Sequence, residues 1–414
     1  MRWISLILLF LTVFITYADK VVIGFAAEPL MKEFSIDSAQ WGLVGSSFSI
    51  LLIVTSFIGG TLSDRVGTYK MIFFVLAGVT IVQFSSFAIV SLPMLILYRV
   101  LLGAVEGPGV PAGMSHISRV FPTELRGRAI SIFVAGGTIS GIISAPILVN
   151  LIEKFGWRWT FVSLGFVSLI IVVFWVLINR NEKKKQKFNT TPIKKIKWSD
   201  ISPVLRNPAC FLTIAISAAT YWLGTWLALW SPVYLTKVLK LAPMKMAYVI
   251  MGTGIVGLVL VLLISAISDR IFKKTQSYRK ARVWIAGIST IIGGLALALI
   301  PLLDNSFLWV FIALGVAKGT TYINVSMAVQ VMIKLMPDRA GFMSSILHLG
   351  NNITSLISPI ITGILVQAAG VNLALGFNYS IYVMAGLCLI TAMLYLLFVK
   401  PDNVTTTPSN RMAM

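Results

Sequence analysis

The sequence predicts an all-α polytopic membrane protein with twelve transmembrane helices, from its composition, its low charge and the layout of its apolar residues. Hydrophobic residues make up 57% of the 414 positions, and only 12% are charged. Soluble domains carry roughly 25% charged residues to cover a surface that faces water. The apolar residues also form long runs that match the thickness of a bilayer. These observations exclude a soluble enzyme, a secreted disulfide scaffold and a disordered chain.

Twelve apolar runs follow one another along the chain. At about 20 residues per crossing, each run is long enough for one membrane-spanning helix. The runs cover 3–27, 39–61, 70–91, 94–118, 129–152, 159–179, 208–235, 246–268, 283–302, 307–333, 341–367 and 373–399. We interpret the first run as an uncleaved helix rather than a signal peptide, because apolar sequence continues past Asp19 and Lys20 to Ala27.

A basic segment divides these runs into six and six. Residues 180–206 carry nine Lys and Arg residues, a composition typical of a solvated linker that faces lipid head groups. We therefore expect an N-terminal six-helix bundle over 1–179 and a basic cytoplasmic linker over 180–206. A C-terminal six-helix bundle over 207–400 and a cytoplasmic tail over 401–414 complete the predicted domains.

The distribution of Lys and Arg predicts the orientation in the membrane. The formal net charge is +20, and 25 of the 34 basic residues fall on one side of the predicted topology against six on the other. Because short cytoplasmic loops are enriched in Lys and Arg, both termini are expected in the cytoplasm. Nucleic-acid binding is the alternative reading of such a charge, but the loops account for it, and no nucleic-acid partner is expected.

The two halves contain related motifs, which indicates two six-helix pseudo-repeats. Residues 102–107 read LGAVEG and residues 314–319 read LGVAKG, at an offset of 212. The Ser-Asp-Arg triplet at 63–65 returns at 268–270, at an offset of 205. Parallel repeats joined by a cytoplasmic loop are one of the known plans of transporters.

The loop after the second predicted helix resembles a known family. Gly60-x-Leu62-Ser63-Asp64-Arg65-x-Gly67-x-x-Lys70 is similar to the signature loop of the major facilitator superfamily. Further matches resemble the anion:cation symporter branch of that superfamily, namely Tyr17-Ala18-Asp19-Lys20, Pro29-Leu30-Met31-Lys32-Glu33-Phe34, Arg99-x-x-x-Gly103-x-x-Glu106-Gly107, Gly156-Trp157-Arg158 and Trp230-x-Pro232-x-Tyr234-Leu235. The resemblance implies the major facilitator fold and a secondary active transporter that works by alternating access. It also implies import of an organic anion, a carboxylate or a sulfonate, in symport with protons.

Five ionisable residues fall inside the apolar runs: Asp19, Lys20, Arg99, Glu106 and Lys318. A charge at the centre of a bilayer costs about 2.5–3.5 kcal/mol on insertion scales, so each is a functional candidate. Arg99 and Glu106 are seven residues apart and share one face of a helix. We expect the five to reach one central cavity. The alternative is that they pair with one another and only hold the bundle together.

The resemblance implies a division of roles among these charges. Arg99 would bind the substrate carboxylate, and Asp19 and Glu106 would carry protons. Arginine suits that role because its planar fork grips a carboxylate with two hydrogen bonds and stays charged. Further substrate-binding candidates are Tyr17, Lys20, Tyr221, Lys318, Asn324, Ser326, His348 and Asn351. Polar side chains in such helices also hydrogen-bond between helices, which is the structural alternative for them.

Two positions depart from the sugar-acid members of the branch. Leu52 stands where those proteins carry an aromatic hydroxyl residue, and Leu347 stands where they carry an asparagine. A buried polar group left without a partner costs roughly 1–3 kcal/mol. We therefore expect a smaller or more apolar anion than a polyhydroxylated acid.

The signature loop and its repeat are predicted to form a cytoplasmic gate. A carboxylate near a helix N-terminus is favoured by the partial positive charge there, and the resemblance implies that such contacts hold the gate closed. The expected gating residues are Asp64, Arg65, Arg126, Arg128, Asp269, Arg270 and Arg339.

Other functions fit the sequence less well. A proton-coupled antiporter that exports drugs or metabolites is the main alternative, but the Gly-Pro pair of such proteins is missing after Gly141. A primary pump would need a phosphate-binding G-x-x-x-x-G-K-[ST] loop and a metalloprotease an H-E-x-x-H motif, and the chain contains neither. We expect no enzyme activity.

The remaining expectations concern partners and location. Cys210 and Cys388 lie in separate apolar runs and are interpreted as packing residues. No cofactor and no metal site is expected. The predicted partners are a small organic anion, protons (with Na⁺ as an alternative) and the lipid bilayer. The protein is expected to be a multi-pass monomer in the cell membrane.

Overall fold

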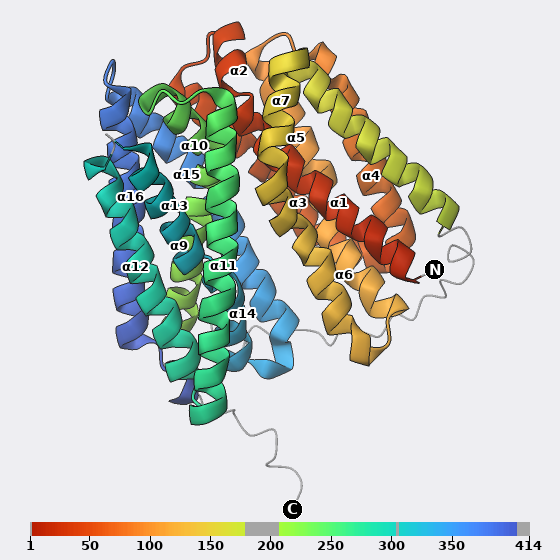
Figure 1. The fold of residues 1–414 in the computed structure, drawn as a ribbon. Helices are drawn as coiled ribbons and strands as arrows, with labels where there is room; N and C mark the ends of the chain where they lie inside the picture. The colour runs from red at the N-terminus through yellow and green to blue at the C-terminus, as the bar shows by residue number, and fades with distance from the viewer. Residues whose placement is uncertain (1, 179–206, 304–305, 404–414) are drawn as a thin grey trace, which may run out of the picture. The chain divides into compact units, whose positions relative to one another are not determined.

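The computed structural model describes residues 2–178, 207–303 and 306–403. Every regular element in these ranges is a helix, and no strand occurs among them (Figure 1). The predicted linker 180–206 and most of the predicted tail lie outside the described residues. Within the described ranges, eleven helical segments are long and apolar enough to cross a membrane.

Residues 2–178 form seven α-helices and one short 3₁₀ turn. They are α1 (Arg2–Phe25), α2 (Ala27–Glu33), α3 (Ser38–Val66), α4 (Thr68–Phe84), η1 (Ser85–Ala88), α5 (Leu92–Glu106), α6 (Gly109–Val120) and α7 (Thr123–Ile178). The start of α3 shows why these helices begin where they do. Asp37 Oδ1 accepts from the Gln40 backbone N–H (2.8 Å) and Gln40 Oε1 accepts from the Asp37 N–H (3.1 Å), a reciprocal capping box.

Residues 207–403 form the second set of helices. They are α9 (Pro208–Leu229), α10 (Ser231–Val233), η3 (Tyr234–Val238), α11 (Pro243–Thr275), η4 (Arg279–Trp284), α12 (Ile285–Leu299), η5 (Ile300–Leu302), α13 (Phe307–Thr321), α14 (Asn324–Leu335), η6 (Pro337–Arg339), α15 (Ala340–Ala368), α16 (Leu373–Phe398) and η7 (Pro401–Asn403).

The helix α7 contains two crossings rather than one. It spans 56 residues, and Gly156 within it has φ 80° and ψ 167°, outside helical geometry. Glycine adopts a positive φ without the steric cost that a Cβ imposes. Figure 1 shows the yellow helix α7 folding back on itself. With α7 divided here, eleven apolar segments make twelve crossings, which confirms the predicted number.

Two predicted helices are interrupted in the middle. The run 94–118 forms α5 and α6, which are separated at Gly107 and Pro108, because proline lacks the N–H that would continue the helix. The run 307–333 forms α13 and α14, separated at Tyr322 and Ile323. The interruption leaves Glu106 as the last residue of α5.

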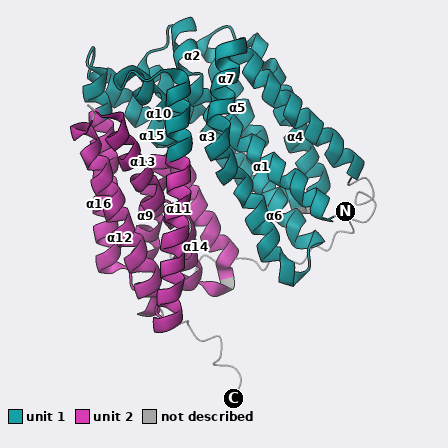
Figure 2. Ribbon diagram, in the orientation of Figure 1, with its two compact units in different colours: residues 1–192, 225–252, 355–377 teal, residues 193–224, 253–354, 378–414 magenta. Residues whose placement is uncertain are grey.

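The chain forms two compact units (Figure 2). Unit 1 comprises residues 1–192, 225–252 and 355–377, and unit 2 comprises residues 193–224, 253–354 and 378–414. Unit 1 therefore joins helices of the N-terminal half to parts of α9, α11, α15 and α16. Within it, a Cβ placed on Gly24 would lie 2.1 Å from the Ala228 carbonyl oxygen. Only glycine permits this approach of the two backbones.

The exposed surface suits a lipid environment. Large apolar side chains such as Phe57, Ile81 and Phe211 are 74%, 70% and 68% exposed. In water such a surface would be an aggregation hazard. In a bilayer it replaces the charged exterior that the composition lacks, and the chain is a multi-pass membrane protein.

A polar cluster joins α2 to the start of the second half of α7. Arg158 Nη2 donates to Glu33 Oε1 (2.7 Å) and to the Ile89 carbonyl (2.8 Å), and Trp157 Nε1 donates to Glu33 Oε2 (2.8 Å). The hydrogen bond from Arg158 is the main cause that lowers the pKa of Glu33 below its ordinary value of 4.5. These contacts give the Gly156-Trp157-Arg158 motif a structural role.

Glu33→Gln is expected to lower the melting temperature of the detergent-solubilised protein modestly at pH 7. Because folding depresses the pKa of Glu33, its stabilising effect is present above pH 4.5 and is lost as the pH falls below that value. The difference between variant and wild type should therefore close in acid, as thermal unfolding at pH 3.5–7 would measure. Glu153→Gln, which changes an exposed carboxylate of α7, is the control. A gap that persists in acid would show that packing, not charge, holds the cluster.

Candidate functional site

Four of the five intramembrane charges lie in unit 1, on α1 and α5. Asp19, Arg99 and Glu106 are buried, with exposed fractions of 0%, 4% and 3%, and Lys20 is half-buried. Electrostatic interactions link Arg99 with Asp19 and with Glu106, and Lys20 with Glu106. The residues that the sequence selected one by one therefore form one cluster inside unit 1.

Arg99 lies in the cluster without a salt bridge to any residue that the structure describes. Its Nη1 donates to the Asp19 backbone carbonyl over 3.5 Å, a long contact, and its guanidinium carbon lies 4.7 Å from the centre of the Phe48 ring. Its Nε is buried and has no hydrogen-bond partner among the described residues. No salt bridge within the described ranges involves Arg99. A buried guanidinium with unused donors is a candidate anion ligand.

The two buried carboxyl groups also have unused oxygens. Both oxygens of Glu106 and Oδ2 of Asp19 are buried and, in the part of the chain that the structure describes, accept no hydrogen bond. Lys20 Nζ lies 5.6 Å from the centres of the Tyr17 and Phe48 rings, so it faces aromatic surface. Phe48 thus lies beside both cations. Its neutral ring gives no signal among the intramembrane charges of the sequence.

A second residue that the sequence analysis missed is Gln83. Its Nε2 donates to Asp19 Oδ1 (2.5 Å), and its Oε1 accepts from the Tyr98 hydroxyl (2.6 Å). Gln83 is fully buried, near the end of α4. The available signal was the single glutamine within the largely apolar run 70–91, and because glutamine is neutral, selection by charge did not include it.

The other predicted substrate residues are described within unit 2. Asn324 is buried, and its Nδ2 donates to Thr220 Oγ1 (3.0 Å) and Thr290 Oγ1 (2.8 Å). It therefore joins α14 to α9 and α12, as the structural alternative for such residues expects. Ser326 is exposed, and its hydroxyl donates to the Ile323 carbonyl (3.1 Å).

The remaining members of that set differ in exposure. Lys318 is half-buried on α13, with Nζ 5.9 Å from the centre of the Tyr322 ring, and its side chain packs against Gly257 of α11. Tyr221 is half-buried, His348 is exposed and Asn351 is buried. The placement of these residues relative to Arg99 stays a prediction.

The predicted gating residues lie at helix ends next to loops. Arg65, Arg126, Arg128 and Arg270 are exposed, and Arg339 is half-buried. Arg126, in the first turn of α7, donates from Nε to the carbonyl of Phe121, which precedes that helix (3.1 Å). The side chain of Asp64 lies outside the described residues.

The second copy of the signature loop has a partner that the sequence analysis missed. Arg282 Nη2 forms a salt bridge of 2.8 Å with Asp269 Oδ1, and its Nη1 donates to the Ser268 hydroxyl. Arg282 is buried at 8% exposure, at the start of the next membrane span. It holds the loop between α11 and η4.

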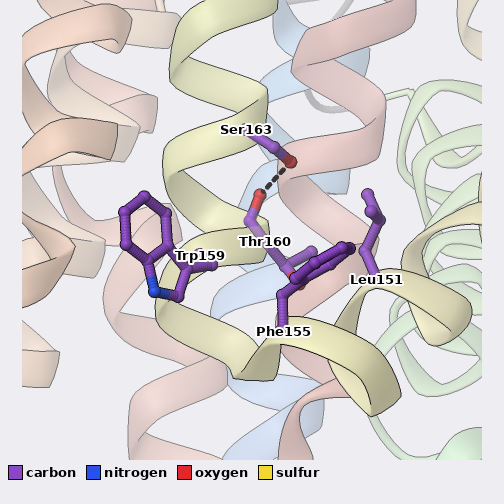
Figure 3. A pocket seen from close by; sticks show the side chains of 5 residues that line it. All are labelled: Leu151, Phe155, Trp159, Thr160 and Ser163. Carbon is purple, nitrogen blue, oxygen red and sulfur yellow. Dashed lines mark hydrogen bonds between the residues drawn. The ribbon is translucent and has the colours of Figure 1, made fainter.

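Among the described residues, unit 1 contains cavities that bear on the candidate site. One, of about 470 Å³, is lined by the charged residues Glu28, Lys32, Glu153 and Lys237, and Lys237 forms a salt bridge with Glu28. Another, of about 390 Å³, lies at the turn of α7 (Figure 3). It is lined by Leu151, Phe155, Trp159, Thr160 and Ser163. Its lining has no charge, so it is no candidate for binding an anion.

Comparison with known proteins identifies the family. The Major Facilitator Superfamily model matches residues 9–336 and 282–413, which together cover almost the whole chain. The chain belongs to the major facilitator superfamily. Its members are transporters rather than enzymes, so the expectations of transport and of no enzyme activity are confirmed.

Curated relatives at 24–26% identity match nearly the full chain. The probable galactarate/D-glucarate transporter of Bacillus subtilis is 26% identical over 97% of this chain and 92% of its own length. The corresponding Escherichia coli K12 protein is 25% identical over 96% and 93%. The hexuronate transporter of B. subtilis is 24% identical over 96% and 94%.

Solved structures support the fold. A bacterial homologue of the human lysosomal transporter Spinster superposes with a TM-score of 0.80 at 18% identity, covering 97% of each chain. A D-xylose–proton symporter superposes with a TM-score of 0.78 at 14% identity, covering 97% of this chain and 99% of its own. At these identities the likeness confirms the predicted major facilitator fold and says nothing of the substrate.

Proposed function

We propose that this superfamily member is a secondary transporter that imports an organic anion, a carboxylate or a sulfonate, in symport with protons. The observation that carries the proposal is the buried Arg99, which forms no salt bridge with the residues that the structure describes. It interacts electrostatically with Asp19 and Glu106, two buried carboxyl groups with oxygens that accept no hydrogen bond from those residues. The names of the relatives support the same class, because those proteins are described as transporters of galactarate, D-glucarate and hexuronate.

The charges of the cluster supply a reason for coupling. Arg99 and Lys20 are cationic, and Asp19 and Glu106 are anionic when ionised, so the four balance. An anion bound at Arg99 adds a negative charge to a desolvated site, where an uncompensated charge is costly. Protonation of Glu106 or Asp19 restores the balance. Substrate and proton therefore stabilise each other in the site, and both are carried in one cycle.

Alternating access needs contacts that open and close on each side of the membrane. On the side opposite the basic loops, we propose that close packing of Gly24 on Ala228 and of Gly42 on Pro359 forms the gate. The Glu28–Lys237 salt bridge, which lines the cavity of about 470 Å³, would belong to the same gate. For the cytoplasmic side, we propose the signature loops with the Asp269–Arg282 pair. Asp64, Arg65, Arg126, Arg128, Arg270 and Arg339 keep their predicted gating roles.

The substrate class can be narrowed by its hydroxyl content. Leu52 is half-buried and Leu347 is buried at 1% exposure, so neither offers a hydrogen bond to a hydroxyl group. We propose that the preferred anion carries fewer hydroxyl groups than galactarate or glucarate.

A thermal-shift screen of the purified protein tests the proposal. It would compare sugar acids, short aliphatic and aromatic carboxylates, sulfonates and lipophilic cations at pH 6 and pH 8. A ligand present at 100 times its Kd stabilises the folded state by about 2.7 kcal/mol, which produces a measurable shift. We expect stabilisation by an anion, followed by uptake of that anion into proteoliposomes when the outside is acidic. Stabilisation by lipophilic cations alone would favour the proton-coupled exporter instead.

A further inference from the structure

We propose that Gln83, locked by Tyr98, is the positioning residue of the proton site at Asp19. The inference deepens the proposed function and rests on it, because it takes Asp19 as a group that binds and releases a proton. The side chain of Gln83 hydrogen-bonds to Asp19 and to Tyr98, neither of which is a predicted substrate ligand. It acts by setting which oxygen of the Asp19 carboxyl group takes the proton and at what pH.

The amide of Gln83 has one orientation that satisfies both neighbours. The Tyr98 hydroxyl donates to Oε1 (2.6 Å), which leaves the NH₂ group to donate to Asp19 Oδ1 (2.5 Å). A reversed amide would place its carbonyl oxygen against an ionised carboxylate, and two acceptors would face each other. The hydroxyl of Tyr98 therefore fixes Gln83 as a donor to Asp19.

Packing holds both side chains in these positions. A Cβ placed on Gly165 of α7 would lie 3.0 Å from Gln83 Cβ, so the α7 backbone presses on the stem of the glutamine. The Tyr98 ring stacks on Phe161 of the same helix, with centroids 5.7 Å apart and planes 9° apart. Side chains confined in this way lose little further freedom when they hydrogen-bond, so the relay from Tyr98 to Asp19 is preorganised.

The hydrogen bond from Gln83 makes the two oxygens of Asp19 different. Oδ1 accepts from Gln83, while Oδ2 is buried and accepts no hydrogen bond from the residues described. Oδ2 is therefore the oxygen available to a proton. A donor on a carboxylate favours the ionised form, so Gln83 makes it easier for Asp19 to release that proton again.

The charged and titratable groups that face Asp19 set the background for this effect. On its own helix they are Lys20 and Tyr17, and on α5 they are Tyr98, Arg99 and Glu106. Helix α4 contributes the neutral Gln83. Against this background, loss of the amide donor removes the one direct hydrogen bond to the Asp19 carboxyl group that the structure gives.

Infrared difference titration of the purified protein in detergent, without substrate, tests the role directly. The Glu106→Gln background leaves Asp19 as the remaining carboxyl of the cluster, and Asp19→Asn identifies its band. A hydrogen bond to a charged group contributes about 1.5–3 kcal/mol. Gln83→Leu should therefore move the midpoint of the Asp19 titration to higher pH by about 1–2 units. Tyr98→Phe, which frees the amide to turn, should move it in the same direction by less.

The control is Thr80→Val, one turn earlier on α4, because the Thr80 hydroxyl donates to the Leu76 carbonyl of its own helix (2.9 Å). It should titrate like wild type. If Asp19 titrates with the wild-type midpoint in both Gln83→Leu and Tyr98→Phe, the inference is overturned. If Gln83→Leu fails to fold, the midpoint in Tyr98→Phe alone decides. The titration needs neither substrate nor gradient. Absence of proton-driven uptake by wild type would refute the proposed function, whereas an unchanged midpoint would refute only the role of Gln83.

Discussion

Arg99→Ala is expected to abolish substrate binding and transport. The guanidinium is buried, has no salt bridge among the described residues and keeps an unused Nε donor. Truncation of one member of a buried charge pair costs about 2–5 kcal/mol, which is roughly 30- to 4,000-fold in Kd. Lys20 cannot replace it, because an ammonium is a point charge and cannot grip a carboxylate with two parallel hydrogen bonds.

Binding should be measured by isothermal titration with the anion found in the screen, and transport by uptake into proteoliposomes. Lys154→Ala, which removes an exposed cation of α7, is the control for the loss of positive charge. Arg99→Lys keeps the charge and loses the fork, so it should bind weakly. The melting temperature without ligand reports whether Arg99→Ala still folds. Folded Arg99→Ala with wild-type affinity would remove Arg99 from the substrate site.

The fold was predictable because membrane helices leave a strong signal in the sequence. Apolar runs of sufficient length predicted twelve crossings, and the structure agrees once Gly156 divides α7. The breaks within spans were not predicted. Pro108 explains the first. In the second, the Thr320 and Thr321 hydroxyls donate to carbonyls of their own helix, at 2.8 Å each, before α13 ends, a local competition that hydropathy does not register.

The site was predictable only as far as charge marks it. An ionisable group in hydrocarbon is costly enough to stand out by itself, and Asp19, Lys20, Arg99 and Glu106 were found in this way. Neutral residues that position those charges carry no such mark. Gln83 contacts Asp19, and Phe48 contacts Arg99, from helices far apart in sequence. Those contacts exist only after folding.

The partner of a charge is also set by packing rather than by motif. The Ser-Asp-Arg triplet pointed to Asp269 and to its neighbour Arg270 as gating residues. The structure pairs Asp269 with Arg282, thirteen residues away at the start of the next span, while Arg270 is exposed. The motif indicates Asp269, but the turn between α11 and η4 determines which arginine is its partner.

Glu106→Gln is expected to separate exchange from accumulation. Glutamine has the shape of a protonated glutamic acid and cannot ionise. The variant therefore mimics Glu106 permanently in its protonated form. The substrate can still bind at Arg99 and cross in exchange for substrate on the other side. Uphill uptake needs a proton to enter with the anion and leave inside. Because Glu106 accepts no hydrogen bond from the described residues, the substitution breaks no hydrogen bond that the structure gives it.

Two assays on the same proteoliposomes measure the separation. Counterflow, with unlabelled anion inside and labelled anion outside, should proceed within a few-fold of wild type. Uptake driven by an acidic exterior should fall to the level reached without a pH gradient. Glu124→Gln, which changes an exposed carboxylate at the start of α7, should retain both activities. If Glu106→Gln still accumulates the anion against its gradient, the proton travels on another group, and Asp19 with its Gln83 donor becomes the sole candidate in the cluster.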